Sequence, residues 1–445
     1  MDDLLAARSQ MAMSLAFHII FAAIGIAMPL LMVLAEAQWL RTKDKIYLEL
    51  AKRWAKGTAI MFAVGAVSGT VLSFELGLLW PTFMEHAGPV IGMPFSMEGF
   101  AFFLEAIFLG IYLYGWEKVS PVKHLLAGVM VAISGTMSGI FVVTANAWMN
   151  TPAGFEVVEG KFTNIDPWAA MFNPAALTQT MHMTFAAFAA VGFAVAGIHA
   201  GFLLKDKANA FHRTALKVAL WVAVPAAFLM PLSGDLSAKH VAEYQPVKLA
   251  AMEGHWDTER GAALHIGGWP DEEAETTRWS IDIPYGLSFL AFADPNAEVK
   301  GLKDFPRDER PPVAITHVAF QIMVGAGFAM MGLGAWVAFL GWRRKALPTD
   351  DLVLKALVAA TPLGFIAVEA GWTVTEVGRQ PWVVHGIMRT ADAVTPMPHL
   401  VVPFTLFSVL YFFLAIMVVY LMRRIVFMSP EREAEVRTLE VAHAE

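Results

Sequence analysis

Ionisable side chains inside apolar segments are the first candidates for chemistry in this chain. A charged group in a hydrocarbon core costs roughly 2.5 to 3.5 kcal/mol on insertion scales, so such residues are rare and mark functional sites. The candidates are His18, Glu75, Glu98, Glu105, His182, His199, His317 and Glu369. Histidine can ligate a haem iron or a metal, and a carboxylate can carry protons.

The ligand types narrow the kind of metal site. The chain has no cysteine, which excludes zinc–thiolate sites, iron–sulfur clusters, disulfides and covalently attached haem. Haem accepts histidine, methionine or oxygen ligands: a His/Met pair gives a low-spin electron-transfer haem, whereas a lone His or Glu leaves a position open for oxygen chemistry. No single residue indicates haem alone, because most of the 25 methionines are packing residues.

The composition places these residues in a membrane protein. Of 445 residues, 57% are hydrophobic and 16% are charged, and the net charge of −7 offers no basic surface for nucleic acid. A hydrocarbon core needs roughly 20 apolar residues per helix. Nine segments meet that length: residues 11–36, 57–80, 94–115, 125–147, 178–203, 218–233, 312–342, 353–373 and 400–422. We therefore predict an all-α polytopic membrane protein with about nine transmembrane helices.

The distribution of Lys and Arg predicts the orientation. Twenty of the 32 lie in alternate short loops and the C-terminal tail, whereas the opposite short segments hold four. Basic loops mark the cytoplasmic side. The N-terminus is then outside and the C-terminus cytoplasmic. The predicted organisation is helices 1–6 in residues 1–233, an extracytoplasmic loop in 234–311, helices 7–9 in 312–425 and a cytoplasmic tail in 426–445.

Depth was counted from the predicted outer ends at about 1.5 Å per residue. On this count His18, Glu98, His182, Met323 and Glu369 lie in the outer half of the bilayer, in a layer parallel to the surface. A transport path would instead spread its polar groups through the full depth. The long loop, with 15 acidic and 8 basic residues, carries the protein's acidity.

Several local runs together resemble subunit I of the cytochrome bd-type quinol oxidases. They are FHIIFAAIGIAMPL around His18, MEGFAFFLEAIFLGIYLYGW from Met97, NAWMNTP from Asn146, VKLAAMEGHW from Val247, FQIMVGAGF from Phe320 and VEAGWTVTEVGRQPW from Val368. The resemblance extends from about residue 8 to about residue 425. Nine spans and an outer N-terminus match that family.

The resemblance implies a role for each site residue. His182 and Met323 match the axial ligands of a low-spin haem b, and His18 and Glu369 match ligands of the two high-spin haems. Glu98 lies at the oxygen-reducing pair, and Glu105 matches a proton-delivery carboxylate, with Ser138 and Asn146 as further candidates on the facing helix. Lys248 and Glu253 match residues tied to quinol binding in the outer loop, called the Q-loop.

The implied cofactors are a low-spin haem b, a high-spin haem b, and either haem d or a further haem b. The implied substrates are ubiquinol or menaquinol and O₂, with protons taken from the cytoplasm. The implied partners are a homologous subunit II, membrane lipid and a small single-helix subunit, all in the bacterial inner membrane.

The chain departs from the family in two places. Its Q-loop is the short type, found also in cyanide-insensitive relatives with little haem d, and Gln321 stands where some relatives carry Arg.

Two other functions are weighed against the oxidase. A membrane b-type cytochrome that only transfers electrons would need two axial ligands at every haem, and the carboxylates at 98 and 369 argue against that. A proton- or ion-coupled transporter would need discontinuous helices and polar groups at the midplane of the membrane. Apart from Glu105, the predicted midplane is apolar. Among the other candidates, His199 is expected to be a packing residue, His317 is expected to face outer water, and the role of Glu75 is left open.

Overall fold

The computed structural model describes residues 1–426, and these form the helices that the hydropathy predicts. Nine helical segments of the described residues are long and apolar enough to cross a membrane. The predicted cytoplasmic tail lies, from residue 427 on, outside the described residues. The chain divides into two compact units, which are described in turn.

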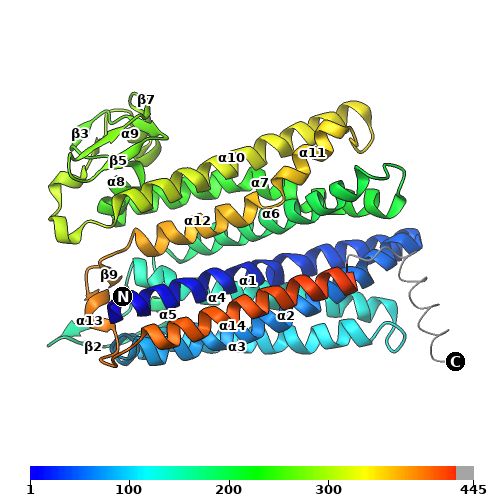
Figure 1. The fold of residues 1–445 in the computed structure, drawn as a ribbon, viewed down its shortest axis with the longest axis horizontal. Coiled ribbons are helices and arrows are strands. Elements are labelled where there is room, and N and C mark those ends of the chain that lie inside the picture. Colours follow the sequence, from blue (N-terminus) through cyan, green and yellow to red (C-terminus); the bar gives the residue numbers. More distant parts are fainter. Residues whose placement is uncertain (427–445) are drawn as a thin grey trace. The chain divides into compact units, whose positions relative to one another are not determined.

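The first unit contains Met1–Phe74, Glu105–Ala132 and the described residues from Met397 on. Its helices are α1 (Asp3–Thr42), most of α2 (Lys45–Leu79), the end of α3 (Pro81–Tyr114), the start of α4 (Pro121–Asn150) and α14 (Val401–Leu421), which η3 (Met422–Val426) follows. Figure 1 shows α1 and α14 side by side. α1 continues through Pro29, as membrane helices do when neighbours satisfy the freed backbone groups.

The second unit contains Glu75–Leu104 and Ile133–Pro396. Its long helices are α6 (Ala176–Leu203), α7 (Ala210–Tyr244), α10 (Val313–Arg344) and the pair α11 (Asp351–Ala360) and α12 (Leu363–Val377). α6 packs along α7 because glycines allow close approach: a Cβ at Gly192 would lie 2.8 Å from Ala223.

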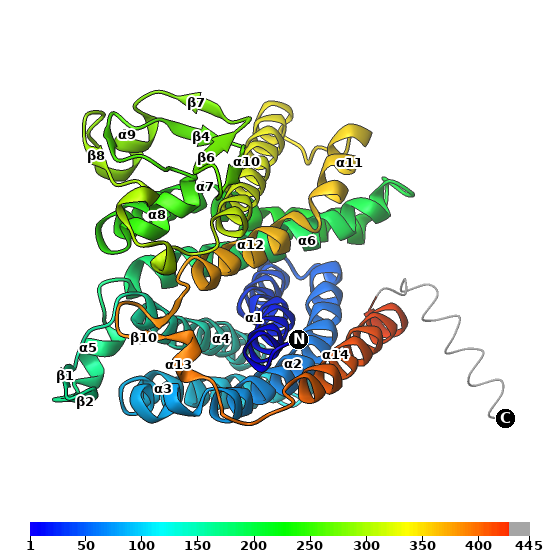
Figure 2. The ribbon, with the colours of Figure 1, turned by 60° about the vertical axis from the view of Figure 1, so that its left-hand side comes forward.

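The long loop folds as short elements beside α7 and α10 (Figure 2). They are α8 (Pro246–Glu253), α9 (Gly286–Phe292), η1 (Leu302–Asp304), η2 (Arg307–Glu309) and the antiparallel pairs β3 (Glu259–Arg260) with β8 (Glu298–Val299), β4 (Leu264–Ile266) with β7 (Ile281–Ile283), and β5 (Trp269–Asp271) with β6 (Thr276–Arg278). Outside this loop, the remaining short elements of the unit are β1 (Glu156–Val158), β2 (Lys161–Thr163), α5 (Pro167–Met171), β9 (Trp382–Val384), β10 (Met388–Arg389) and α13 (Thr390–Ala393).

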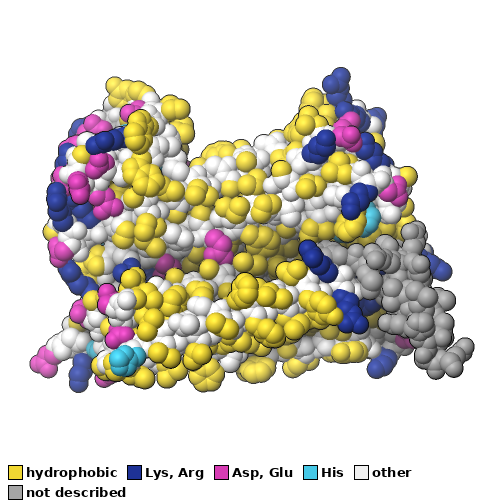
Figure 3. Space-filling model, viewed as in Figure 1, with side chains coloured by type: hydrophobic (Ala, Val, Ile, Leu, Met, Phe, Trp, Pro, Cys, Tyr) yellow, Lys and Arg dark blue, Asp and Glu magenta, His cyan; other side chains and the backbone are white. Residues whose placement is uncertain are grey.

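α8 is one of the parts of the loop that contact the membrane helices. Leu249 packs in a loop core with Leu287 and Val299. Met252 packs with Ala319 of α10 and with Ala370 and Val374 of α12. The helix is buried from Lys248 to Glu253. In Figure 3, charged side chains gather over the loop and at the turn between α10 and α11, while hydrophobic side chains cover the helices of this unit between them.

Several helix boundaries differ from the prediction, and three of them bear on the site. α7 continues to Tyr244, eleven residues past the predicted end at 233, because its last turns are polar and therefore invisible to hydropathy. The eighth span is two helices, which meet at Thr361–Pro362. α3 begins at Pro81 instead of residue 94, so Glu98 lies near the middle of that helix. Counting from the helix start therefore does not place Glu98 near an outer end.

Candidate functional site

His182 is held in place from the neighbouring helix. The residue lies in α6, and its Nδ1 is 2.9 Å from Oγ of Ser233 in α7. Ser233 is buried, and its hydroxyl also bonds the carbonyl oxygen of Met230 at 3.0 Å. The next residue, Gly234, faces the ring: a Cβ there would lie 3.5 Å from Cε1 of His182. The bond occupies Nδ1, so Nε2 is the ring atom that can hold an iron.

His18 of α1 is held in the same way in the first unit. Its Nδ1 is 3.0 Å from Oγ of Ser68 in α2. Ser68 is fully buried and bonds the carbonyl oxygens of Val64 and Gly65 in its own helix. A Cβ at Gly69 would lie 2.9 Å from Cε1 of His18, a distance that side chains do not tolerate. Nε2 is again the ring atom left for a metal.

Met323 lies in α10 where α12 comes close. A Cβ at Gly371 of α12 would be 3.0 Å from Sδ of Met323. The methionine is half-buried and packs against the cluster of Met252, Ala319 and Ala370. A thioether in this apolar setting is suited to haem ligation.

Of the three predicted carboxylates, one is buried and two are half-buried. Glu369 of α12 is half-buried, and its Oε1 has no hydrogen-bond partner among the described residues. Glu105 is 5% exposed and faces the small residue Gly25, whose Cβ would lie 3.7 Å from its Oε1. Glu98 is half-buried on the same helix as Glu105. A buried carboxyl without a partner is available to a ligand or a proton.

A chain of polar side chains joins the loop helix α8 to the membrane helices α4 and α12. Lys248 Nζ donates to Oδ1 of Asn150 at 2.6 Å, and Asn150 Nδ2 donates to Oδ1 of Asn146 at 3.1 Å. Asn146 Nδ2 in turn donates to Oε1 of Glu376. Arg379 Nη2 donates to the other carboxylate oxygen of Glu376 at 2.5 Å. Of the predicted residues, the structure brings together Lys248 and Asn146.

The electrostatics around these polar side chains disfavour additional positive charge. Burial, followed by the positive charge of Arg379, lowers the pKa of Lys248 to about 7, against a smaller opposite effect of Glu376. Burial and the same two cations, Lys248 and Arg379, lower the pKa of His385 to about 4. Nη1 of Arg379 is buried without a hydrogen-bond partner among the described residues.

Glu253, at the other end of α8, does not belong to the hydrogen-bonded series of side chains from Lys248 to Arg379. It is 5% exposed, and its Oε2 has no partner among the described residues. Burial raises its pKa to about 8. Five residues separate it from Lys248, so the two side chains project from different faces of α8. Each has a pKa near neutrality, and each can therefore exchange a proton at physiological pH.

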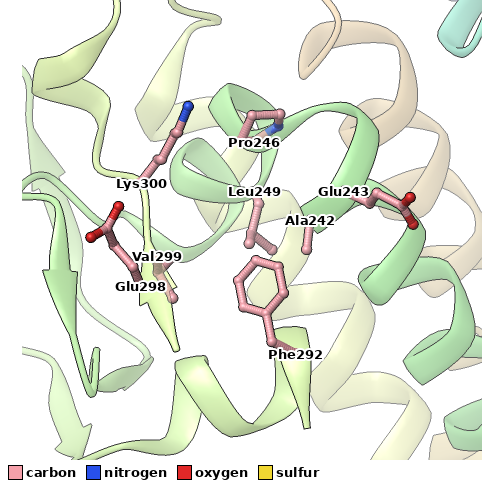
Figure 4. Close-up of a pocket in the computed structure, with 8 residues that line it drawn as sticks. All are labelled: Ala242, Glu243, Pro246, Leu249, Phe292, Glu298, Val299 and Lys300. Atoms are coloured by element: carbon pink, nitrogen blue, oxygen red, sulfur yellow. The ribbon is translucent and has the colours of Figure 1, made fainter. Parts of the chain in front are cut away.

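A surface hollow lies on the side of α8 that carries Leu249. Its volume is about 190 Å³, and its lining includes Leu249, Phe292, Glu298 and Lys300. Figure 4 shows Leu249 and Phe292 at its centre and the charged side chains at its rim. Neither Lys248 nor Glu253 lines it, so the hollow is separate from the chain described above.

The sequence analysis missed Glu376, Arg379, Asn150 and Gln245. Gln245 Nε2 donates to the carbonyl oxygen of Asn150 at 2.6 Å. Glu376 and Arg379 stand three residues apart within the run VEAGWTVTEVGRQPW, and that spacing places them as neighbours. Glu376 lies beyond the predicted end of the span at 373, so it did not stand out as an intramembrane carboxylate. Ser138 lies half-buried in α4, about two turns before Asn146.

Two of the other histidines can now be placed. His199 bonds Nδ1 of His212 at 2.9 Å across α6 and α7, as expected of a packing residue. The expectation for His317 was wrong: it is fully buried, with its ring nitrogens 2.8 and 3.0 Å from the carbonyl oxygens of Met252 and Gly267. The loop covers the His317 side chain, and this contact between distant residues cannot be predicted from hydropathy.

The fold and these groups define a multi-pass membrane protein with histidine, methionine and carboxylate side chains available to haem. A family model described as "Cytochrome bd terminal oxidase subunit I" matches residues 6–430, and the chain belongs to this family. It is thus subunit I of a cytochrome bd quinol oxidase, a respiratory terminal oxidase of the bacterial inner membrane that acts with a subunit II.

Individual relatives agree over nearly the whole chain. A Bacillus subtilis (strain 168) protein provisionally named cytochrome bd menaquinol oxidase subunit I is 39% identical over 95% of this chain and 96% of its own length. Cytochrome bd ubiquinol oxidase subunit 1 of the same organism is 36% identical over 95% and 93%. The structure of the bd oxidase from Geobacillus thermodenitrificans matches with a TM-score of 0.90 and 42% identity, over 95% of this chain and 98% of that one. The predicted oxidase is confirmed, and the electron-transfer cytochrome and the transporter are set aside.

Proposed function

We propose that this subunit carries three haems, oxidises quinol at the Q-loop and reduces O₂ with protons from the cytoplasm. His182 and Met323 hold a low-spin haem b. His18 and a carboxylate of α12, Glu369, hold two high-spin haems, one a haem b and the other haem d or a further haem b. Glu98 lies at the oxygen-reducing pair. When bound, the haems supply the one-electron steps between quinol and O₂.

The residues present fit haem. Both histidines have Nδ1 occupied and Nε2 left for iron. Glu369 Oε1 is a buried acceptor without a partner among the described residues, as a ligand position requires. Arg379 Nη1 is a buried donor that also has no hydrogen-bond partner among the described residues, and it suits a haem propionate.

The observation that carries the quinol proposal is the polar chain from Lys248 to Arg379. Oxidation of a quinol releases two protons, which need acceptors. Neutral Lys248, with a pKa near 7, accepts one from a quinol hydroxyl. Glu253, with a pKa near 8, is a base for the other in the fraction of molecules in which its carboxyl is deprotonated. Both lie in α8, the helix that packs the loop onto α10 and α12, so the protons leave on the side of the loop.

The protons consumed with O₂ take a different route. We assign Glu105 to it, because Glu105 is a buried carboxyl seven residues from Glu98 on one face of α3. Ser138 and Asn146 of α4 are further candidates. With the N-terminus and the loop outside and the C-terminus cytoplasmic, quinol protons are released outside and the consumed protons enter from inside. Charge is thereby separated without a pump.

The proposal also covers the type of quinol and the neighbours of this subunit in the membrane. The short Q-loop suits either ubiquinol or menaquinol, the quinols named for the two Bacillus subtilis relatives. Subunit II is accompanied by membrane lipid and a small single-helix subunit, which the exposed apolar side chains of α14 (Leu406, Val409 and Phe412) could contact.

One set of spectra tests the proposal. Purified oxidase is compared with its His182→Ala variant by reduced-minus-oxidised spectra, carbon monoxide difference spectra and haem extraction. We expect three haems in the parent protein and selective loss of the low-spin haem in the variant, with carbon monoxide binding kept. A variant that keeps the low-spin spectrum would exclude His182 as its ligand.

A further inference from the structure

The two histidine sites are built from the same local pattern, although they lie in different units of the chain. His18 begins the run HIIFAA and His182 begins HMTFAA, so both read His-x-x-Phe-Ala-Ala. Each histidine bonds a serine that glycine follows directly, Ser68-Gly69 and Ser233-Gly234. The serine stands 50 residues after His18 and 51 after His182. One arrangement thus occurs twice.

The serine hydroxyls decide which ring nitrogen carries the proton. A hydroxyl has one proton to donate. That of Ser233 goes to the carbonyl oxygen of Met230, and that of Ser68 to the carbonyl oxygen of Val64 or Gly65. The serine oxygen is therefore an acceptor towards Nδ1–H of the histidine. The neutral ring then carries its lone pair at Nε2, which is the form that binds a metal.

We infer that Ser68 and Ser233 are positioning residues that fix the tautomer and orientation of His18 and His182, so that each presents Nε2 to a haem iron. The inference rests on the proposed function, in which both histidines are haem ligands. A hydrogen bond from the second ring nitrogen raises the basicity of the ligand and stabilises the ferric state. Neither serine touches the haem itself in this role.

The glycines add a steric part to each pattern. At Gly69 a Cβ would approach Cε1 of His18 to 2.9 Å, so the ring occupies the space of the absent side chain. At Gly234 the corresponding distance is 3.5 Å, an ordinary contact. The histidine therefore lies closer to the glycine at His18 than at His182. Gly69→Ala should displace its histidine, whereas Gly234→Ala should be tolerated.

The test uses the complete oxidase with Ser233→Ala or Ser68→Ala. Ser237→Ala and Ser73→Ala are matched controls, because Ser237 bonds the carbonyl oxygen of Thr178 and Ser73 that of Gly69, and neither bonds a histidine. Redox titration should show the low-spin haem easier to reduce in Ser233→Ala, with the equilibrium constant changed about tenfold, which is about 59 mV for one electron. Resonance Raman of the ferrous enzyme should show a weaker iron–imidazole bond in Ser68→Ala.

The outcomes separate this inference from the proposed function. If His182→Ala loses the low-spin haem while Ser233→Ala keeps the parent potential, the positioning role is wrong and the ligand assignment stands. If His182→Ala keeps that haem, the ligand assignment itself fails. Gly69→Ala and Gly234→Ala with identical haem content and spectra would contradict the steric part. A change in both serine variants, absent in both controls, supports the inference.

Discussion

Lys248 of the loop helix and Asn150 of a membrane helix are joined by a 2.6 Å hydrogen bond from Nζ to Oδ1. The bond connects a group that titrates near neutral pH to the polar chain ending at Arg379. Changes in Lys248 should therefore be seen in quinol oxidation, and the rate should depend on pH.

Replacing Lys248 with Met keeps much of the side-chain volume and removes the amine. Because burial lowers the pKa of Lys248 to about 7, the amine becomes a proton acceptor as the pH rises through 7. In the parent enzyme, kcat/KM for quinol should rise through pH 7 and level off only above pH 8, where Glu253 is deprotonated as well. Lys248→Met should lose this rise and about 100-fold in rate. Lys303→Met, which removes an exposed partner of Asp257, is the control and should keep the parent profile.

Glu253 should make the folded loop sensitive to alkaline pH. Burial raises its pKa from 4.5 to about 8, so the folded state binds a proton that the unfolded state releases. The stabilisation is complete below about pH 4.5 and is lost as the pH rises through 8. Protease cleavage of the loop should therefore be faster at pH 8.5 than at pH 6. Glu253→Gln should weaken this difference, and an unaltered pH dependence would assign it to another group.

Met323→Leu conserves volume and removes the sulfur. We expect loss of the low-spin haem signal and of quinol oxidation, with carbon monoxide binding at the other haems kept. Met330→Leu, a buried methionine of the same helix, is the matched control and should leave the spectrum unchanged. A normal low-spin band in Met323→Leu would remove this residue from the ligand set.

Glu105→Gln preserves size and hydrogen bonding but cannot release a proton. We expect an assembled enzyme that turns over about 100-fold more slowly, with less haem loss than Glu98→Gln. Glu85→Gln, an exposed carboxyl of the same helix, should retain activity. Full oxidase activity and membrane potential in Glu105→Gln would place the proton path elsewhere, and Glu75 would be tested next.

The two carboxylates of α12 can be distinguished by haem content. Glu369 and Glu376 are seven residues apart on one helix face. Glu369→Gln should lose one high-spin haem, measured by haem extraction and the carbon monoxide spectrum. Glu376→Gln should break the bonds to Asn146 and Arg379 and slow turnover with the haems kept. The reverse result would transfer the ligand role to Glu376.

Hydropathy was sufficient to predict that the chain forms nine long membrane helices within the described residues. The nine spans were predictable because apolar length is a local property of the sequence. The last turns of α7 were not, since their residues are too polar to be recognised as part of a span. Glu376 lies just past the apolar run and was overlooked for the same reason.

The partners of the site residues depend on contacts between distant parts of the chain. Lys248 and Asn150 are 98 residues apart, and Asn146 and Glu376 are 230 apart. No periodicity in the sequence encodes such pairs. Ser68 and Ser233 could not be recognised from the sequence either, since serine is common in membrane helices. Their proposed role follows only from the hydrogen bond that each makes to a histidine in the structure.

The way α10 holds the loop bears on how this protein can diverge. The ring nitrogens of His317 lie 2.8 and 3.0 Å from carbonyl oxygens of Met252 and Gly267, and Gln321 bonds the carbonyl oxygen of His265 and the amide of Gly267. All four contacts are to main-chain atoms, three of them carbonyl oxygens and one an amide, so none depends on a side chain of the loop. The side chains of Met252 and His265 can therefore change in evolution without loss of these contacts, whereas the positive φ of Gly267 favours glycine at that position.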